Sequence, residues 1–189
     1  MQISKKDLRI KRIWTFKIWN KSAKDGRYVH NAVFVNDKKF IAVYHSATEH
    51  RFEYWEVTCR GNSWHPVEIG ATKGEFMRNN SPVQGIAYDK KRKQIYLAFN
   101  DYLFKTNRAG KVLTSGHFHT GREFEGICVN DSYLYAELAQ RLELLRQKIK
   151  KDITASFEFT FIKVHNSKCL FKKGVVFYLW SKIITSRLS

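Results

Sequence analysis

The sequence lacks features that mark several common classes of protein. Proline occurs only 2 times in 189 residues, and no low-complexity tract is present, so the composition is not that of a disordered chain. The 3 cysteines are an odd number and form no CxxC pair. This pattern argues against a disulfide framework and against a structural zinc site. We therefore interpret Cys59, Cys128 and Cys169 as buried or idle thiols.

Long apolar runs are also missing. The longest run, VVFYLW at residues 175–180, is far shorter than the roughly 20 residues that span a bilayer. The N-terminal stretch is basic but lacks the apolar core of about 7–15 residues that a secretory signal peptide contains. On this basis we expect a protein without a transmembrane segment that begins in the cytoplasm.

Acidic residues are few, with 17 Asp and Glu against 34 Lys and Arg, and the formal net charge is +17. Such an excess suggests nucleic acid or another anionic surface as a partner. The excess is uneven, because residues 1–30 carry +7 and residues 141–189 carry +8, whereas residues 31–83 are neutral. A domain that reads nucleic acid usually carries its charge on the binding element, so the sequence leaves this partner open without favouring it.

Three segments share one pattern: a polar residue, a small residue, an alternating apolar run, a short turn and a returning run. They begin at Asn31, Gln84 and Glu125. Asn and Asp suit such turns because they tolerate positive φ and bond their own backbone. The pattern therefore predicts three hairpins, with turns at Asn36-Asp37, Asp89-Lys90 and Asn130-Asp131.

The spacing of these segments indicates a repeat architecture. The starts lie 53 and 41 residues apart, and the second spacing falls within the period of about 40–50 residues that propeller blades have. The longer first spacing predicts an insertion between residues 45 and 82. With a third and a fourth strand after each hairpin, the sequence predicts an all-β chain of four-stranded, β-propeller-like blades. At this length about four blades are expected, as an incomplete or truncated ring.

We expect one domain over residues 1–189, with repeats at 28–83, 84–124 and 125–160 and diverged C-terminal strands at 161–189. The segment RLELLRQKI at residues 141–149 has two interpretations. A strand there preserves the repeat. A helix is the alternative, because Leu138, Leu142, Leu145 and Ile149 form a stripe at helical spacing. We favour the strand.

Two phrases carry a resemblance to a known family: GIAYDKKRKQIYLAFNDYLFKTNRAGKVL and EFEGICVNDSYLY. They resemble repeats of the bacterial SdiA-regulated family and of the wider phytase-like, esterase-like and gluconolactonase-like (SMP-30 and NHL-type) propellers, over about residues 81–145. The resemblance implies a propeller and, in gluconolactonase-like relatives, a channel metal held at a Glu-Gly start, which corresponds to Glu125. The family is usually exported or membrane-anchored, so the resemblance leaves the compartment open.

In a propeller the first strand of each blade lines the central channel, so Asn31, Gln84 and Glu125 are predicted to bind a ligand at the channel mouth. Their oxygen atoms suit Ca²⁺, which takes about 6–8 oxygen ligands. Glu125 and Asn31 are the candidate metal ligands. The alternative is that the three side chains bond backbone N–H groups at the blade ends. No catalytic residue is assigned.

Other clusters of polar residues carry weaker hypotheses. His117 and His119 are two residues apart, and on a strand they would share one face and suit a transition metal. Glu123 and Glu125 would share a face in the same way and form a candidate acid/base pair. The lysine-rich run at residues 90–93 falls in a predicted hairpin turn, where solvation is the favoured interpretation.

The leading hypothesis is a ligand-binding or protein-interaction module of the SdiA-regulated type, with a small anionic ligand or another protein as its partner. One alternative is a Ca²⁺-assisted hydrolase of a phosphate or lactone substrate, in which case calcium is the cofactor. The other alternative is a basic binder of nucleic acid or an anionic surface. The sequence leaves open whether the protein is an enzyme.

Overall fold

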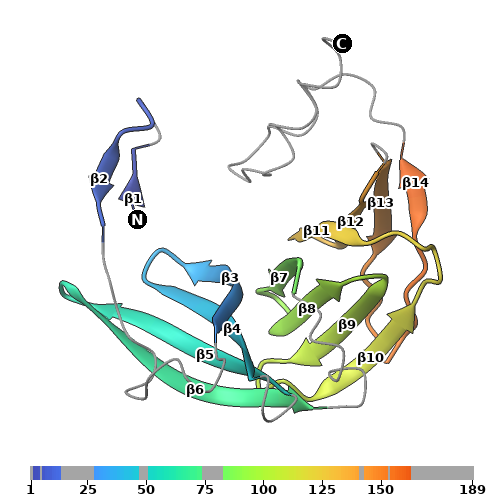
Figure 1. Ribbon diagram of the computed structural model, residues 1–189, viewed down its shortest axis with the longest axis horizontal. Coiled ribbons are helices and arrows are strands. Elements are labelled where there is room, and N and C mark those ends of the chain that lie inside the picture. Colours follow the sequence, from blue (N-terminus) through green and yellow to red (C-terminus); the bar gives the residue numbers. More distant parts are fainter. Residues whose placement is uncertain are drawn as a thin grey trace.

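The structure is a computed structural model of the chain, and it describes residues 2–4, 6–13, 28–46, 51–73, 83–140, 143–152 and 154–162. These residues form strands and turns, arranged as three four-stranded antiparallel sheets and one small two-stranded sheet (Figure 1). Within this part of the chain, no helix is long and apolar enough to cross a membrane. The prediction of an all-β chain with four-stranded repeats is confirmed.

Each four-stranded sheet is a meander whose strands keep their order in the chain. The first sheet contains β3 (Tyr28–Asn36), β4 (Lys39–Ser46), β5 (Arg51–Arg60) and β6 (Ser63–Lys73). The second contains β7 (Gly85–Asp89), β8 (Gln94–Phe99), β9 (Tyr102–Asn107) and β10 (Val112–His117). The third contains β11 (Phe124–Asn130), β12 (Tyr133–Leu138), β13 (Glu143–Lys148) and β14 (Thr160–Ile162). The small sheet pairs β1 (Gln2–Ile3) with β2 (Ile10–Arg12).

The three sheets are arranged as the blades of a β-propeller. Figure 1 shows the inner strands β3, β7 and β11 turned toward one common region, with β6, β10 and β14 at the periphery. The inner strand of the middle sheet, β7, contacts both β3 and β11. Three blades of an incomplete ring are therefore present in the described residues. The C-terminal strands expected at residues 161–189 begin in β14, the fourth strand of the third blade, and residues 163–189 lie outside the described part of the chain.

The middle blade is covered on both faces by its neighbours. All six residues of β8 are buried. Ile95 and Leu97 join an apolar cluster with the first blade, whereas Tyr96 and Ala98 join a cluster with the third. Because both faces of β8 are covered, its sequence is an almost continuous apolar run without the alternation of a half-exposed strand. Each blade thus depends on the next for its burial.

The predicted hairpin turns are present. At the end of β3, Asn36 Oδ1 accepts a hydrogen bond of 2.9 Å from the backbone N–H of Lys38. At the end of β7, Asp89 Oδ1 accepts one of 2.9 Å from the backbone N–H of Lys91. In the third hairpin Asp131 has a positive φ of 53°, which Asp tolerates better than most residues. In each turn an Asn or Asp either bonds the backbone of its own turn or adopts a positive φ, as predicted.

The segment at residues 141–149 contains the strand β13, so the favoured interpretation is confirmed for Glu143–Lys148 and the helical alternative is wrong there. Leu145 pairs with Ala136 of β12 on one side and with Phe161 of β14 on the other. Two neighbouring strands satisfy the backbone of β13, and this tertiary pairing outweighs the helix propensity of its residues.

The greater length of the first repeat, predicted as an insertion, lies largely in its outer strands. The strands β5 and β6 have 10 and 11 residues, whereas β9 and β10 have 6 each. The register between β5 and β6 shifts once, between Tyr54 and Trp55. Because β5 and β6 are long, the first blade reaches the turn between β9 and β10 of the second blade.

Glycines allow the first and second blades to approach closely. A Cβ on Gly70, whose φ is +152°, would clash with the carbonyl oxygen of Ala109. Gly110 has a φ of +81°, and a Cβ there would lie 2.7 Å from the carbonyl carbon of Ala71. Thr72 Oγ1 then donates a hydrogen bond of 2.6 Å to the carbonyl oxygen of Gly110. The β9–β10 turn is thus seated directly on the backbone of β6.

The second and third blades meet through Gly85 at the start of β7. A Cβ on Gly85 would lie 2.9 Å from the backbone nitrogen of Ile127 and 3.3 Å from the carbonyl carbon of Gly126. A side chain at this position would therefore push the inner strands β7 and β11 apart. Gly126, one residue from this contact, has more room, because its Cβ would meet only Glu137 Oε2 at 3.9 Å.

We expect Gly85→Ala to destabilise the protein by about 1–3 kcal/mol, the usual cost of overpacking a well-packed interior. Gly126→Ala is the matched control, with an expected change within about 0.5 kcal/mol. Urea denaturation of both variants measures the difference. Equal stabilities of the two variants would contradict the close approach of β7 and β11.

Candidate functional site

A chain of hydrogen bonds joins the three blades where the inner strands begin. Asn31 on β3 donates from Nδ2 to the backbone carbonyl oxygen of Gln84, at 3.2 Å. Gln84, immediately before β7, donates from Nε2 to Glu123 Oε2, at 2.6 Å. Its Oε1 accepts a hydrogen bond of 2.6 Å from the backbone N–H of Asn100. We call Asn31, Gln84, Asn100 and Glu123 the polar rim.

The amide side chains of Asn31 and Gln84 are each held through both their oxygen and their nitrogen. Asn31 Oδ1 accepts a hydrogen bond of 2.9 Å from the backbone N–H of Ala32, while its Nδ2 contacts Gln84. Gln84 is held between Asn100 and Glu123, and its backbone N–H donates to Ala98 at 2.9 Å. Because each amide both donates and accepts, its orientation is determined by its partners.

Glu125 lies beside this network without joining it. The register between β11 and β12 shifts between Phe124 and Gly126, which makes Glu125 the extra residue of a β-bulge. A bulge re-aims side chains relative to regular alternation. Within the described residues, the exposed carboxylate of Glu125 contacts neither Asn31 nor Gln84. The carboxylate that bonds Gln84 belongs to Glu123, which the sequence analysis considered only as half of an acid/base pair.

The bulge also changes the interpretation of Glu123 and Glu125 as a pair. Glu123 precedes β11, which begins at Phe124, and Glu125 is the bulged residue. The strand alternation that would place both carboxylates on one face therefore does not apply. The useful signal in the sequence was the Glu-Phe-Glu spacing itself, since it supplies two carboxylates to the start of one inner strand.

The donor set of the polar rim matches calcium only in part. Oxygen ligands are present, but Glu123 Oε2 and the amide oxygens of Asn31 and Gln84 already accept N–H hydrogen bonds. In the parts of the chain that the structure describes, no three His, Cys, Asp or Glu side chains are grouped so that they could hold a metal ion. Calcium binding at Glu125 and Asn31 stays a prediction.

The two candidate zinc ligands do not share a strand face. β10 ends at His117, and His119 follows it with a positive φ of 46°. The ring of His117 stacks on Tyr102 at a centroid distance of 4.0 Å, and its Nε2 lies 3.0 Å from Asp101 Oδ2. The strand ends between the two residues, so the imidazoles do not extend from one strand, but the fold still brings their rings together, with ring centroids 3.6 Å apart.

A second polar cluster, absent from the sequence analysis, lies between the second and third blades. Lys105 on β9 is 5% exposed and donates from Nζ to the carbonyl oxygen of Ala155 at 3.4 Å. Burial lowers the pKa of Lys105, because desolvation disfavours the ammonium form, while Asp152 opposes this shift. Nearby, Gln147 Nε2 donates to the carbonyl oxygen of Ser156 at 3.3 Å. These groups line a cavity of about 10 Å³, about the size of one water molecule.

The fold and these contacts define the chain as a protein with β-propeller blades. No protein-family model matches it, and no curated protein is found as a relative. Solved structures similar to it include the β-propeller domain of Cps50 (Swd1) from Myceliophteria thermophila, with 10% sequence identity, a TM-score of 0.49 and coverage of 70% of this chain and 44% of that one.

Two other solved structures are WD40 domains. The C-terminal WD40 domain of Sif2 is 11% identical, with a TM-score of 0.47 and coverage of 68% of this chain and 35% of that one. The WD40 domain of SCAP from fission yeast is 9% identical, with a TM-score of 0.42 and coverage of 72% and 40%. The chain therefore spans less than half of the length of each of these three structures.

The hydrogen bond between Gln84 and Glu123 generates a charge-swap prediction. Gln84→Glu places two carboxylates side by side, so we expect a loss of about 1 kcal/mol near pH 7. The loss should shrink as the pH falls toward about 4, where carboxyl groups become protonated. The double variant Gln84→Glu/Glu123→Gln restores a donor and an acceptor and should recover most of the stability. Urea denaturation of both variants measures their free energies of unfolding. If the double variant is no more stable than Gln84→Glu, the result contradicts a hydrogen bond between residues 84 and 123.

Proposed function

We propose that the chain is a β-propeller interaction module that binds another protein at the polar rim. The observation that supports this proposal is the hydrogen-bonded chain from Asn31 through Gln84 to Glu123, which crosses all three blades. A surface held in this way loses little conformational freedom when a partner binds, and such preorganisation favours affinity.

The charge on the rim indicates what kind of segment it would bind. Glu123 of the rim and the neighbouring Glu125 are exposed, whereas the Asp101 side chain is mostly buried beside His117. The nearby Arg122 directs its guanidinium to backbone carbonyl oxygens, with Nε 2.8 Å from that of Ala139. The available charge is therefore negative in a protein whose net charge is +17. A partner segment with Lys, Arg or amide donors complements it, and a small anionic ligand fits it less well.

Two narrower forms of the proposal depend on the sequence resemblance. Assignment to the SdiA-regulated type is supported by the phrases within residues 81–145. A Ca²⁺-assisted hydrolase is supported by the same phrases and by the carboxylates of Glu123 and Glu125. Thermal melting tests the calcium form: a rise in Tm with Ca²⁺ that disappears in Glu125→Gln would support it, and equal Tm values in Ca²⁺ and in EDTA would remove it.

Selection of peptides from a displayed library of random short sequences tests the interaction module itself. We expect basic or amide-rich peptides to be enriched, and we expect their affinity to fall at least about tenfold in Glu123→Gln/Glu125→Gln, a change of about 1.4 kcal/mol. Fluorescence anisotropy with an enriched, labelled peptide measures the change.

The matched control is Asp37→Asn/Asp131→Asn, which removes the same charge from exposed turns of the first and third blades. This control should keep the affinity of the unmodified protein. Enriched peptides that bind equally well to both double variants would place the interaction away from the polar rim.

A further inference from the structure

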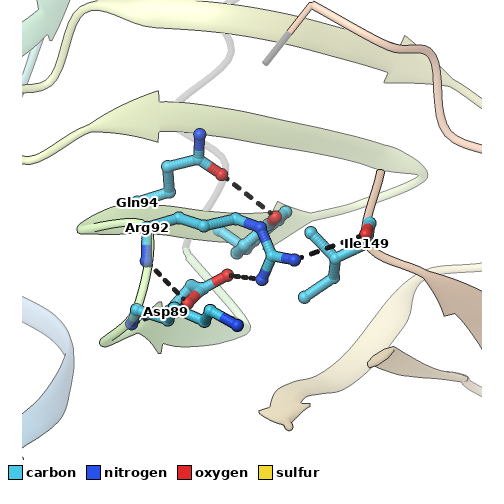
Figure 2. A network of polar contacts seen from close by, with 6 residues as sticks. Asp89, Arg92, Gln94 and Ile149 are labelled. Atoms are coloured by element: carbon cyan, nitrogen blue, oxygen red, sulfur yellow. Dashed lines mark hydrogen bonds and ion pairs between the residues drawn. The ribbon is translucent and has the colours of Figure 1, made fainter. Parts of the chain in front are cut away.

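Two lysine runs that are far apart in the sequence meet at the end of β7 opposite to the polar rim. One is the turn between β7 and β8, residues 90–93, and the other is residues 148–151 at the end of β13. Figure 2 shows Arg92 of the first run between the carboxylate of Asp89 and the backbone of Ile149 in the second. Arg92 Nη1 lies 2.7 Å from Asp89 Oδ2, and Nη2 lies 3.5 Å from the carbonyl oxygen of Ile149.

Asp89 holds this junction in place. It is 1% exposed, and its Oδ1 accepts backbone N–H groups of Lys91 at 2.9 Å and of Arg92 at 3.0 Å. One carboxylate therefore shapes the turn and also directs the guanidinium toward the third blade. Because Arg92 is engaged in this contact, the charges left at the surface are ammonium groups of lysines.

We call these exposed lysines the basic edge: Lys90, Lys91, Lys93, Lys148, Lys150 and Lys151. Three exposed carboxylates lie near it, those of Asp131, Asp152 and Glu158. Glu158 Oε1 pairs with Lys150 Nζ at 2.9 Å, and Asp152 Oδ1 accepts a hydrogen bond of 2.8 Å from the backbone N–H of Thr154. This surface has six exposed lysines and three exposed carboxylates, so its net charge is positive.

We propose that the basic edge binds the phosphate backbone of a nucleic acid without reading its bases. Lysine ammonium groups are compact charges at the end of flexible side chains. They attract phosphates without the fixed bidentate geometry that an arginine guanidinium requires. A DNA duplex carries one negative charge per about 1.7 Å of its axis, so it matches a row of several lysines better than a single ion does. The two runs lie together because Arg92 bonds the backbone of Ile149 and because Ile149 belongs to the same apolar cluster as Tyr96 of β8.

The same surface fits a membrane or an acidic peptide less well. Binding in a membrane interface combines charge with inserted apolar side chains, and peptide recognition relies on apolar or aromatic anchors. None of the exposed large hydrophobic residues of the described chain belongs to either lysine run: they are Leu8, Ile10, Ile13, Val29, Phe34, Val67 and Phe161. Charge is what the described residues of this edge offer, and the closely spaced phosphates of a nucleic acid complement several lysines at once.

The basic edge is independent of the proposed protein-binding rim. Gln84 of the polar rim immediately precedes β7. Asp89, which holds the turn that carries part of the basic edge, is the last residue of β7. The two surfaces therefore lie at opposite ends of one inner strand, and a protein and a nucleic acid can occupy them together. Loss of peptide binding at the rim would leave this second proposal intact, and the reverse also holds.

Fluorescence anisotropy of a labelled mixed-sequence DNA duplex, measured over a series of NaCl concentrations, tests the proposal. We expect log Kd to change linearly with log salt, with a slope of about 0.9 per phosphate contact, and duplexes of different sequence to bind alike. In Lys90→Gln/Lys91→Gln/Lys93→Gln the binding should weaken, and the slope should fall by about three. Circular dichroism verifies that the variant is folded.

The matched control is Lys11→Gln/Lys73→Gln/Lys111→Gln, which removes three exposed lysines outside both runs and lowers the net charge equally. This control should keep most of the affinity and slope. Equal losses in the two triple variants, or an unchanged slope in the first, would overturn the proposal. Phosphatidylserine vesicles form the other arm: lysine-dependent binding to vesicles, with no binding to DNA, would assign the edge to a membrane and also overturn it.

Discussion

The contact between the inner strands β7 and β11 is the constraint on which the rest of the structure depends. Gly85 leaves no room for a side chain against the backbone of Ile127, so the second and third blades meet backbone to backbone. The two proposed binding surfaces lie at the two ends of this contact. Gln84 reaches Glu123 at one end, and Arg92 reaches Ile149 at the other. A wider spacing of these strands would lengthen both contacts together.

Apolar burial and polar contacts play different parts between the blades. The apolar clusters on both faces of β8 provide the burial that a single four-stranded sheet lacks. The polar contacts constrain how one blade is placed on the next more narrowly than apolar burial does. Thr72 bonds the carbonyl of Gly110 between the first and second blades, and Lys105 bonds the carbonyl of Ala155 between the second and third. Because a buried polar group without a partner is costly, such pairs favour one relative placement of neighbouring blades.

The charge of the protein is organised by the ends of the inner strands. Carboxylates Glu123 and Glu125 lie at one end, and the basic edge lies at the other. The contrast is local, since the chain as a whole has a large positive charge. A four-stranded meander produces this separation, because the β7–β8 turn emerges at one end of the blade, whereas the β8–β9 turn and the connection from β10 to β11 emerge at the other. The two proposed partners, one protein and one nucleic acid, correspond to these two sides.

Local patterns in the sequence determined the blades and their turns. Asn36, Asp89 and Asp131 predicted hairpins correctly, because each turn is formed by interactions within a few residues. The strand β13 was also predictable, although its residues favour a helix in isolation, because the repeat required a third strand there.

Only the tertiary structure decided which side chains meet. Glu123, and not the bulged Glu125, bonds Gln84, and the rings of His117 and His119 lie 3.6 Å apart although β10 ends at His117. The two lysine runs lie side by side through contacts of Ile149 with Arg92, a residue 57 positions away in the chain, and with the apolar cluster that contains Tyr96. Hairpins follow from neighbouring residues, whereas the placement of one blade on the next follows from packing and strand irregularities that no short segment contains.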